Sequence, residues 1–134
     1  MTERSVRICI GRSFSRARTM MIHAALHWPE ACDESLWPLA LAHAVYLHNN
    51  TPNAESGVAP IEIYSGTLRD HQAIRNAHVW GSPCYVLDPR LSSAGGKIPK
   101  WQPRSRRGQC VGLSPNHAEN VPLVRDLRTG HLSP

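Results

Sequence analysis

The spacing of apolar residues changes along this chain, and that change limits the folds available to it. Up to residue 66, apolar side chains recur every three or four positions, which is the period of an amphipathic helix. From residue 78 they occur in short runs separated by Gly and Pro, which is typical of β-strands. Eleven Pro and nine Gly also predict many loops and few long regular elements. We therefore expect an α+β chain made of two small units.

The first unit is predicted to be a helical hairpin. One helix covers residues 14–28, and Pro29 ends it because proline disfavours the helical conformation in the residue before it. Gly11 weakens an extension of this helix toward the N-terminus. A second helix runs from about Ser35 to Asn49, and the short link between the two favours a hairpin. The apolar face of the first helix is formed by Ala17, Met20, Met21, Ala24, Ala25 and Trp28.

A shorter helical segment closes the first unit. Within residues 59–66, Pro60 suits the first helical position and Gly66 suits the C-terminal cap. Residues 67–77 are predicted to be an exposed connector. The second unit, residues 78–134, is expected to be a small β-barrel. Its strands are predicted at 78–87, 109–113 and 121–127, with a tight turn at 128–130 before a final strand at His131.

Charge and cysteine content narrow the choice of partners. Residues 31–60 carry three acids and no Lys or Arg, whereas residues 79–134 carry eight cations and three acids. Basic ends around an acidic middle suit a nucleic-acid partner, and equally a basic soluble surface. No pair of cysteines has the spacing of a zinc knuckle or a redox dithiol, so we expect reduced intracellular thiols. The apolar stretches are too short to span a bilayer, so no membrane partner is expected.

The densest group of cations surrounds one aromatic residue near the start of a predicted strand. Cations there can contact phosphates while the Trp101 ring stacks on a base. Two other interpretations stay open: a solvated loop whose Trp packs on the barrel, and contact with a protein. The candidate nucleic-acid-binding residues are Lys97, Lys100, Trp101, Arg104, Arg106 and Arg107.

Other chemistry receives less support from the sequence. His23 and His27 are one helical turn apart, a spacing that can bind zinc, but no third ligand is evident and a solvated helix face explains them as well. No nucleophile elbow or phosphate-binding loop is present. The carboxylates are too scattered for the converging ligands that two-metal catalysis requires. The sequence therefore predicts neither a metal site nor an autonomous nuclease.

Several segments together resemble the integrases of copia-type LTR retrotransposons, in the order that this family has them. The resemblance extends from Ala17 nearly to the end of the chain. The segments are Arg18–Trp28, Leu36–Leu41, Tyr46–Pro52, Ala59–Gly66, His78–Val86, Pro103–Gly108 and Val111–Ser114.

The resemblance implies a particular domain organisation. Residues 1–66 correspond to the helical carboxy-terminal remnant of an RNase H-like catalytic core, residues 67–77 to a connector, and residues 78–134 to an SH3-like β-barrel. The last strand of that module would extend beyond Pro134. Intact members of the family belong to a polyprotein and act in the nucleus. They insert a DNA copy of the element into host DNA, using two Asp and one Glu to hold divalent Mg or Mn ions.

The resemblance also implies that this chain is not catalytic by itself. The segment that begins at Glu3 is similar to the family's catalytic Glu motif, but it lies about four residues farther from Arg18 than the family pattern requires. Both Asp-bearing strands are missing, so no catalytic residue beyond a possible Glu3 remnant and no cofactor are expected. We expect a non-catalytic polyprotein fragment that binds DNA or RNA weakly and without sequence preference.

Two alternatives remain. One is an interaction module or functionless relic that self-associates through an exposed helical hairpin, with Met20, Met21, Trp28 and Trp37 facing the partner. The other is a metal-dependent strand transferase whose missing Asp residues come from another chain.

Overall fold

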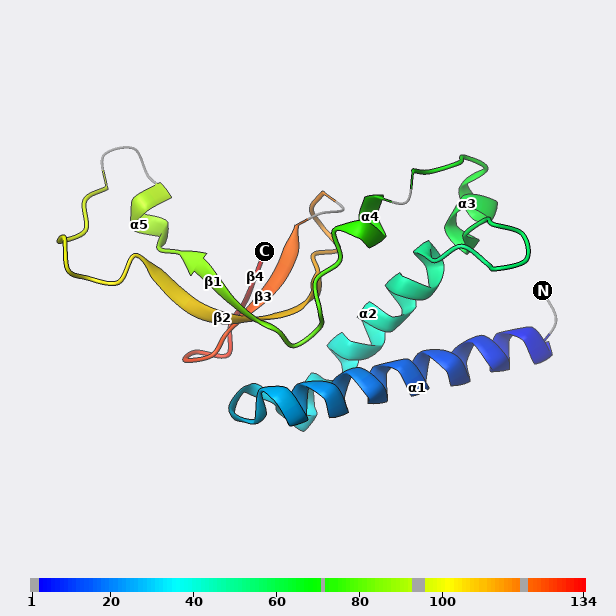
Figure 1. The fold of residues 1–134 in the computed structure, drawn as a ribbon, viewed down its shortest axis with the longest axis horizontal. Coiled ribbons are helices and arrows are strands. Elements are labelled where there is room, and N and C mark those ends of the chain that lie inside the picture. The colour runs from blue at the N-terminus through cyan, green and yellow to red at the C-terminus, as the bar shows by residue number, and fades with distance from the viewer. Residues whose placement is uncertain (1–2, 71, 93–95, 119–120) are drawn as a thin grey trace.

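The computed structural model describes residues 3–70, 72–92, 96–118 and 121–134, and it shows helices followed by an open antiparallel sheet (Figure 1). The α+β class predicted from the sequence is confirmed. The helices are α1 (Glu3–His27), α2 (Trp37–Asn50), α3 (Pro60–Ser65), α4 (Gln72–Arg75) and α5 (Pro89–Ser92), with 3₁₀ turns at Pro29–Ala31 and Glu34–Leu36. The strands are β1 (Pro83–Leu87), β2 (Ser105–Leu113), β3 (Pro122–Asp126) and β4 (Leu132–Ser133).

Helix α1 is longer than the sequence pattern predicts. It runs for 25 residues and passes through Gly11, so it begins well before the predicted start at residue 14. A glycine inside a helix costs about 1 kcal/mol relative to alanine. That cost is small beside the contact between α1 and α2, which bury Ala17, Ala24, Ala40 and other small side chains against each other. Tertiary packing therefore outweighs local propensity.

The predicted helical hairpin is confirmed, and two local features mark the start of its second helix. The Asp33 side chain accepts a hydrogen bond from the Ser35 backbone N–H at 2.9 Å and caps the 3₁₀ turn that leads into α2. Pro38 lies in the first turn of α2, where its missing N–H would have no helical partner. Alanines on both helices give the pair a core of small side chains.

The predicted short helix is observed as α3, and one buried carboxylate fixes the chain around it. Glu62 is only 4% exposed and accepts hydrogen bonds from the backbone N–H groups of Ala59 and Arg69, both at 2.7 Å. Gly66 ends the helix with a φ of 67°, as its predicted role as C-terminal cap requires. The connector then forms α4, a short helix that the sequence pattern does not predict.

The four strands lie in the order in which they occur in the sequence, each antiparallel to the next. β2 begins at Ser105, four residues before the predicted start at Gln109, so part of the basic segment is strand rather than loop. The register of β2 against β3 shifts between Cys110 and Gly112, and Gly112 has a φ of 134°. The predicted tight turn is present between β3 and β4, where Gly130 has a φ of 72°.

The described strands form an open sheet rather than a closed barrel. β1 and β4 are its two edges, and no pairing joins them within the described residues. β4 has only two residues, too few to extend the sheet around to β1. The coarse prediction of a small antiparallel β unit is confirmed, whereas closure of that unit is not observed.

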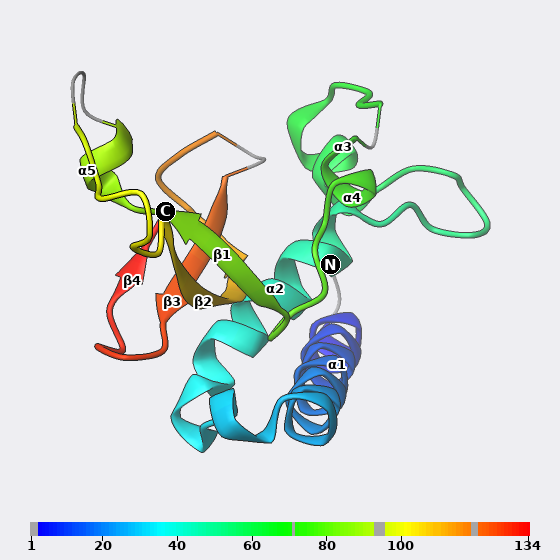
Figure 2. The same ribbon diagram turned by 60° about the vertical axis from the view of Figure 1, so that its left-hand side comes forward.

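The sheet packs directly on the helices. Figure 2 shows α2 lying between α1 and the sheet, and β2 is the strand that contacts α2 most. Trp80, just before β1, is 3% exposed and belongs to the helical core, and its Nε1–H donates to the Val111 carbonyl oxygen at 3.0 Å. A Cβ atom on Gly81 would lie 2.8 Å from the Ala24 Cβ, so the backbone passes close to α1. The two predicted units share one core.

Because Trp80 connects the helices to the sheet, its truncation should unfold both together. We expect Trp80→Ala to lower the free energy of unfolding by about 3–5 kcal/mol, since it empties a buried site of its largest side chain. Urea unfolding followed by circular dichroism measures this difference.

Trp101→Ala is the matched control because the Trp101 ring is 91% exposed. That variant should lie within about 0.5 kcal/mol of the unaltered chain. Equal losses for the two variants would contradict the role assigned to Trp80.

Candidate nucleic-acid interface

The structure divides the six candidate residues between a loop and a strand. Residues 96–104, hereafter the basic loop, precede β2 and project at the opposite end of the molecule from α3 (Figure 1). The loop carries four of the six candidates, all exposed, and Arg106 and Arg107 lie within β2 itself. The four candidates in the loop are Lys97, Lys100, Trp101 and Arg104.

The two arginines of β2 do not join the cations of the loop. Successive side chains of a strand point to opposite faces of the sheet, so Arg106 and Arg107 diverge. Arg106 Nη1 lies 3.1 Å from Asp126 Oδ2, and its Nη2 lies 3.4 Å from Ser133 Oγ. Arg107 Nη2 lies 3.2 Å from Glu30 Oε1 near the helices. The expected cluster of five cations is therefore split, and two of its members are paired with acids of the same chain.

Arg106 belongs to a small network that holds the turn between β3 and β4. Asp126 Oδ1 accepts hydrogen bonds from the backbone N–H groups of Arg128 at 2.8 Å and Thr129 at 3.2 Å. These backbone hydrogen bonds, that of Arg128 first, lower the pKa of Asp126, and the positive charge of Arg106 adds to the effect. Asp126 is only 8% exposed, whereas the side chain of its partner Arg106 is 44% exposed. Arg106 is thus better explained as a structural residue than as a phosphate contact.

The basic loop keeps three cations beside one exposed aromatic ring. Within the described residues, Lys97, Lys100 and Arg104 form no ion pair. Trp101 is 91% exposed, and Lys100 Nζ lies 5.7 Å from the centroid of its ring, within the range of a cation–π contact. The alternative in which Trp101 packs on the sheet is therefore not observed. An exposed ring among unpaired cations provides the two features that bind single-stranded nucleic acid.

One end of the basic loop is anchored to the chain after β1. The Asp88 backbone N–H donates to the Arg104 carbonyl oxygen at 2.9 Å. The guanidinium of Arg90 forms two hydrogen bonds with the Asp88 carboxylate, at 3.1 and 2.9 Å, and lowers the pKa of Asp88 to about 2. The ion pair keeps this carboxylate from repelling phosphates as strongly as an unpaired one would. Arg90 in turn contributes little free charge to the interface.

Tyr85 is an exposed aromatic residue that is not among the six candidate nucleic-acid-binding residues. It is 75% exposed and lies directly opposite Arg107 in the register of β1 and β2. Exposed and half-buried residues alternate along β1, with Cys84 and Val86 on the half-buried side. The sequence gives no such signal, because residues 84–87 are all apolar, and only the structure shows that Tyr85 lies on the exposed side. Tyr85 adds a second stacking surface on the strand next to the basic segment.

The remaining candidates do not assemble into a catalytic or metal site among the described residues. Glu3 begins α1, and its side chain lies outside what the structure describes. The rings of His23 and His27 are 4.3 Å apart and both lie near Trp28. In the described part of the chain, no three His, Cys, Asp or Glu side chains are grouped so that they could hold a metal ion.

Two thiols in the sheet are poor nucleophiles. Cys84 and Cys110 lie on neighbouring strands, and burial raises the pKa of both. The thiolate is the reactive form of cysteine, so a raised pKa keeps these side chains protonated and unreactive at neutral pH. Cys110 is a buried core residue, and Cys84 is half-buried beside it.

No helix in the described residues is both long and apolar enough to cross a membrane. Comparison of the chain with protein-family models, with curated proteins and with solved structures finds no match.

The Asp126 network predicts how stability depends on pH. The folded state lowers the pKa of Asp126, so the stabilisation is present above the unfolded pKa, near 4, and is lost as pH falls through the lower folded value. We expect the free energy of unfolding to fall below about pH 4, and to fall less steeply in Asp126→Asn. Urea unfolding between pH 7 and pH 2 measures the slope.

Glu55→Gln is the control, because it removes an exposed carboxylate from a loop outside the sheet. Its pH profile should follow that of the unaltered chain. A profile of Asp126→Asn as steep as the control's would show that this carboxylate is not the group responsible.

Proposed function

We propose that this chain is a non-catalytic piece of a retrotransposon integrase region that binds nucleic acid weakly and without sequence preference. The observation that carries the proposal is the basic loop, in which Trp101 is 91% exposed beside Lys97, Lys100 and Arg104. Other apolar side chains of this chain are as exposed, such as Tyr64 at 91%, so the proposal rests on the combination of an exposed aromatic ring with adjacent cations. Nucleic acid provides both the planar bases and the anionic charge that this surface complements.

The proposed contacts favour single strands. Bases in a duplex are stacked on each other, so a tryptophan ring reaches them only where the strand is open. Three cations are few, and the acid Asp88 lies beside the end of the loop in its own ion pair. The expected affinity is therefore low, and it should depend strongly on salt because phosphate contacts release counterions.

The proposed origin rests on the family resemblance and on the order of the elements. A helical hairpin, a short capped helix and an antiparallel sheet follow one another in the order expected for the end of an RNase H-like core and an SH3-like module. The open sheet is compatible with an SH3-like module that lacks its last strand. We identify residues 1–66 and 78–134 with these two parts as a proposal.

We propose that this chain is not an enzyme by itself. Strand transfer in the intact family requires two Asp and one Glu to hold divalent ions, and this sequence offers only Glu3 as an equivalent. A strand transferase completed by another chain would need that chain to supply both Asp residues. Metal-dependent strand transfer that requires such a partner and disappears in Glu3→Gln would favour this third possibility.

The proposed interface is tested by fluorescence anisotropy on a labelled oligo(dT) and on a DNA duplex over a salt series. We expect tighter binding to the single strand. The triple Ala variant of Lys97, Lys100 and Arg104 tests the phosphate contacts. If each of the three contacts one phosphate, this variant should show a shallower slope of log K against log salt on the single strand. The expected difference is about 2, at roughly 0.7 per phosphate. Trp101→Ala should weaken single-strand binding by about 1–3 kcal/mol and change duplex binding less.

A matched control separates the site from the net charge. Arg12, Arg16 and Arg18 are exposed on α1, so their triple Ala variant loses the same three charges elsewhere. This variant should keep most of the affinity for the single strand. Equal losses in the two triple variants would show that binding depends on overall charge, and no binding at low salt by folded protein would remove the proposal.

Self-association is a second candidate function, favoured by an apolar surface along α1 and α2. Ile10 and Phe14 are each 52% exposed, and Val45 is 41% exposed on the neighbouring helix. These side chains border a shallow hollow of about 270 Å³. This surface differs from the one expected from the sequence: Met20, Met21 and Trp28 pack against the core, and of the four named residues only Trp37 is mainly exposed, at 54%.

If copies of the chain associate through this surface, Val45→Asp should shift the population toward monomer. A charge at the centre of an apolar contact has no partner there and loses its hydration. Sedimentation equilibrium measures the change in dissociation constant, which we expect to be at least about tenfold.

Ile63→Asp is the control, since Ile63 is 73% exposed on α3 and lies outside the hollow. It should leave the dissociation constant unchanged. A chain that is monomeric at high concentration, or equal effects of both variants, would exclude this surface as the contact.

A further inference from the structure

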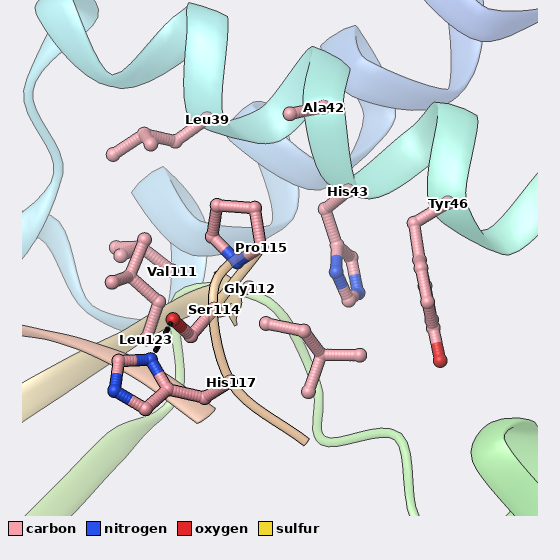
Figure 3. Close-up of a pocket in the computed structure, with 11 residues that line it drawn as sticks. Leu39, Ala42, His43, Tyr46, Val111, Gly112, Ser114, Pro115, His117 and Leu123 are labelled. Atoms are coloured by element: carbon pink, nitrogen blue, oxygen red, sulfur yellow. Dashed lines mark hydrogen bonds between the residues drawn. The ribbon is translucent and has the colours of Figure 1, made fainter. Parts of the chain in front are cut away.

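A cavity lies between α2 and the end of β2, away from the basic loop (Figure 3). Its volume is about 450 Å³, within the range of pockets that hold small organic molecules. Most of its lining is apolar and comes from three sources: helix α2, strands β2 and β3, and the link between those strands. The apolar lining residues include Leu39, Ala42, Val111, Leu113, Pro115 and Leu123.

One buried polar atom in this lining has no partner. His43 is 6% exposed and extends from α2 into the cavity, where Figure 3 shows its ring beside Gly112. Its Nδ1 lies 3.6 Å from the position that a Cβ on Gly112 would occupy. No described protein group forms a hydrogen bond with Nδ1. Buried polar side-chain atoms in folded proteins nearly always have such a partner, so this nitrogen indicates a ligand atom.

Two polar side chains on the link after β2 already form a hydrogen bond with each other. Ser114 Oγ and His117 Nδ1 form a hydrogen bond of 2.8 Å, drawn as the dashed line in Figure 3. This pair lies on the link after β2, across the cavity from α2. A ligand therefore meets the unpartnered His43 Nδ1 and a largely apolar wall. That combination suits a molecule with an apolar body and a single polar substituent.

We propose that this cavity binds a small neutral molecule with an apolar body and one hydroxyl group, which donates a hydrogen bond to His43 Nδ1. Burial lowers the pKa of His43, so the ring is neutral at neutral pH and one of its nitrogens accepts a hydrogen bond. Among the described residues, no Asp or Glu and no Lys or Arg lines the cavity, so the described lining offers no ion pair to a charged ligand. The proposal is independent of nucleic-acid binding by the basic loop.

The probe is 2-naphthol, with 2-methoxynaphthalene as its matched partner without a donor. Titration of ¹⁵N-labelled protein followed by NMR gives the dissociation constants and locates the site. We expect 2-naphthol to shift the signals of His43 and Leu113 and to bind about twofold to tenfold more tightly than the ether, the range expected for one hydrogen bond. Equal affinity of the two compounds would overturn the role of His43.

Two variants test the location without depending on the ligand's chemistry. Ala42 is exposed at the cavity wall, so Ala42→Trp fills the space without disturbing the core and should abolish binding. Ala25→Trp places the same side chain on an exposed position of α1 and should bind like the unaltered chain.

A third variant tests the hydrogen bond itself. His43→Phe keeps an aromatic ring and should reduce the affinity for 2-naphthol to that for the ether.

Each result of these titrations either supports or overturns the proposal. Loss of binding in Ala42→Trp alone, with a preference for the hydroxyl that disappears in His43→Phe, supports the proposal. Binding that survives Ala42→Trp, or no shift of these signals with 2-naphthol at millimolar concentration, overturns it. Circular dichroism of each variant shows that it is folded before the titration.

Discussion

The insertion of Trp80 into the helical core is the contact on which the rest of the structure depends. Its ring is 3% exposed among alanines of α1 and α2, and its Nε1–H donates to the backbone of β2. One side chain thus attaches the sheet to both helices. The core between the two helices consists mainly of small residues, which bury little apolar area. The indole ring of Trp80 therefore provides much of the apolar volume of this core.

Further links between the two halves of the chain follow from this attachment. With the sheet held against α2, Arg107 reaches Glu30, and Arg125 on β3 reaches both the Ala31 carbonyl at 3.3 Å and the Asp33 carboxylate at 3.8 Å. These contacts join residues far apart in the sequence at the link between α1 and α2. Each pair is partly exposed and contributes modestly, but together they keep the sheet in one orientation on the hairpin. The cavity that contains His43 exists only because that orientation is held.

The same contacts decide which cations are available to a partner. A stretch rich in Arg and Lys looks uniform in the sequence, but strand β2 extends into it and sends Arg106 and Arg107 to opposite faces, where acids meet them. Within the described residues, the cations of the loop before the strand form no ion pair, since Asp88 beside the loop is paired with Arg90. These cations and Trp101 therefore stay exposed. The candidate interface is therefore smaller than the motif that first indicated it. It gains Tyr85, which the register places beside the strand part of the motif.

The sequence by itself determined the elements whose signals are local. Apolar spacing predicted α1 and α2, Pro60 and Gly66 delimited α3, and Gly130 marked the turn between β3 and β4, because each of these depends on residues a few positions apart. Only the tertiary structure decided the length of α1 beyond Gly11, the early start of β2, the open sheet, the pairing of Arg106 and Arg107, and the isolation of His43 Nδ1. Those features depend on contacts between residues tens of positions apart, and periodicity carries no information about which distant side chains meet.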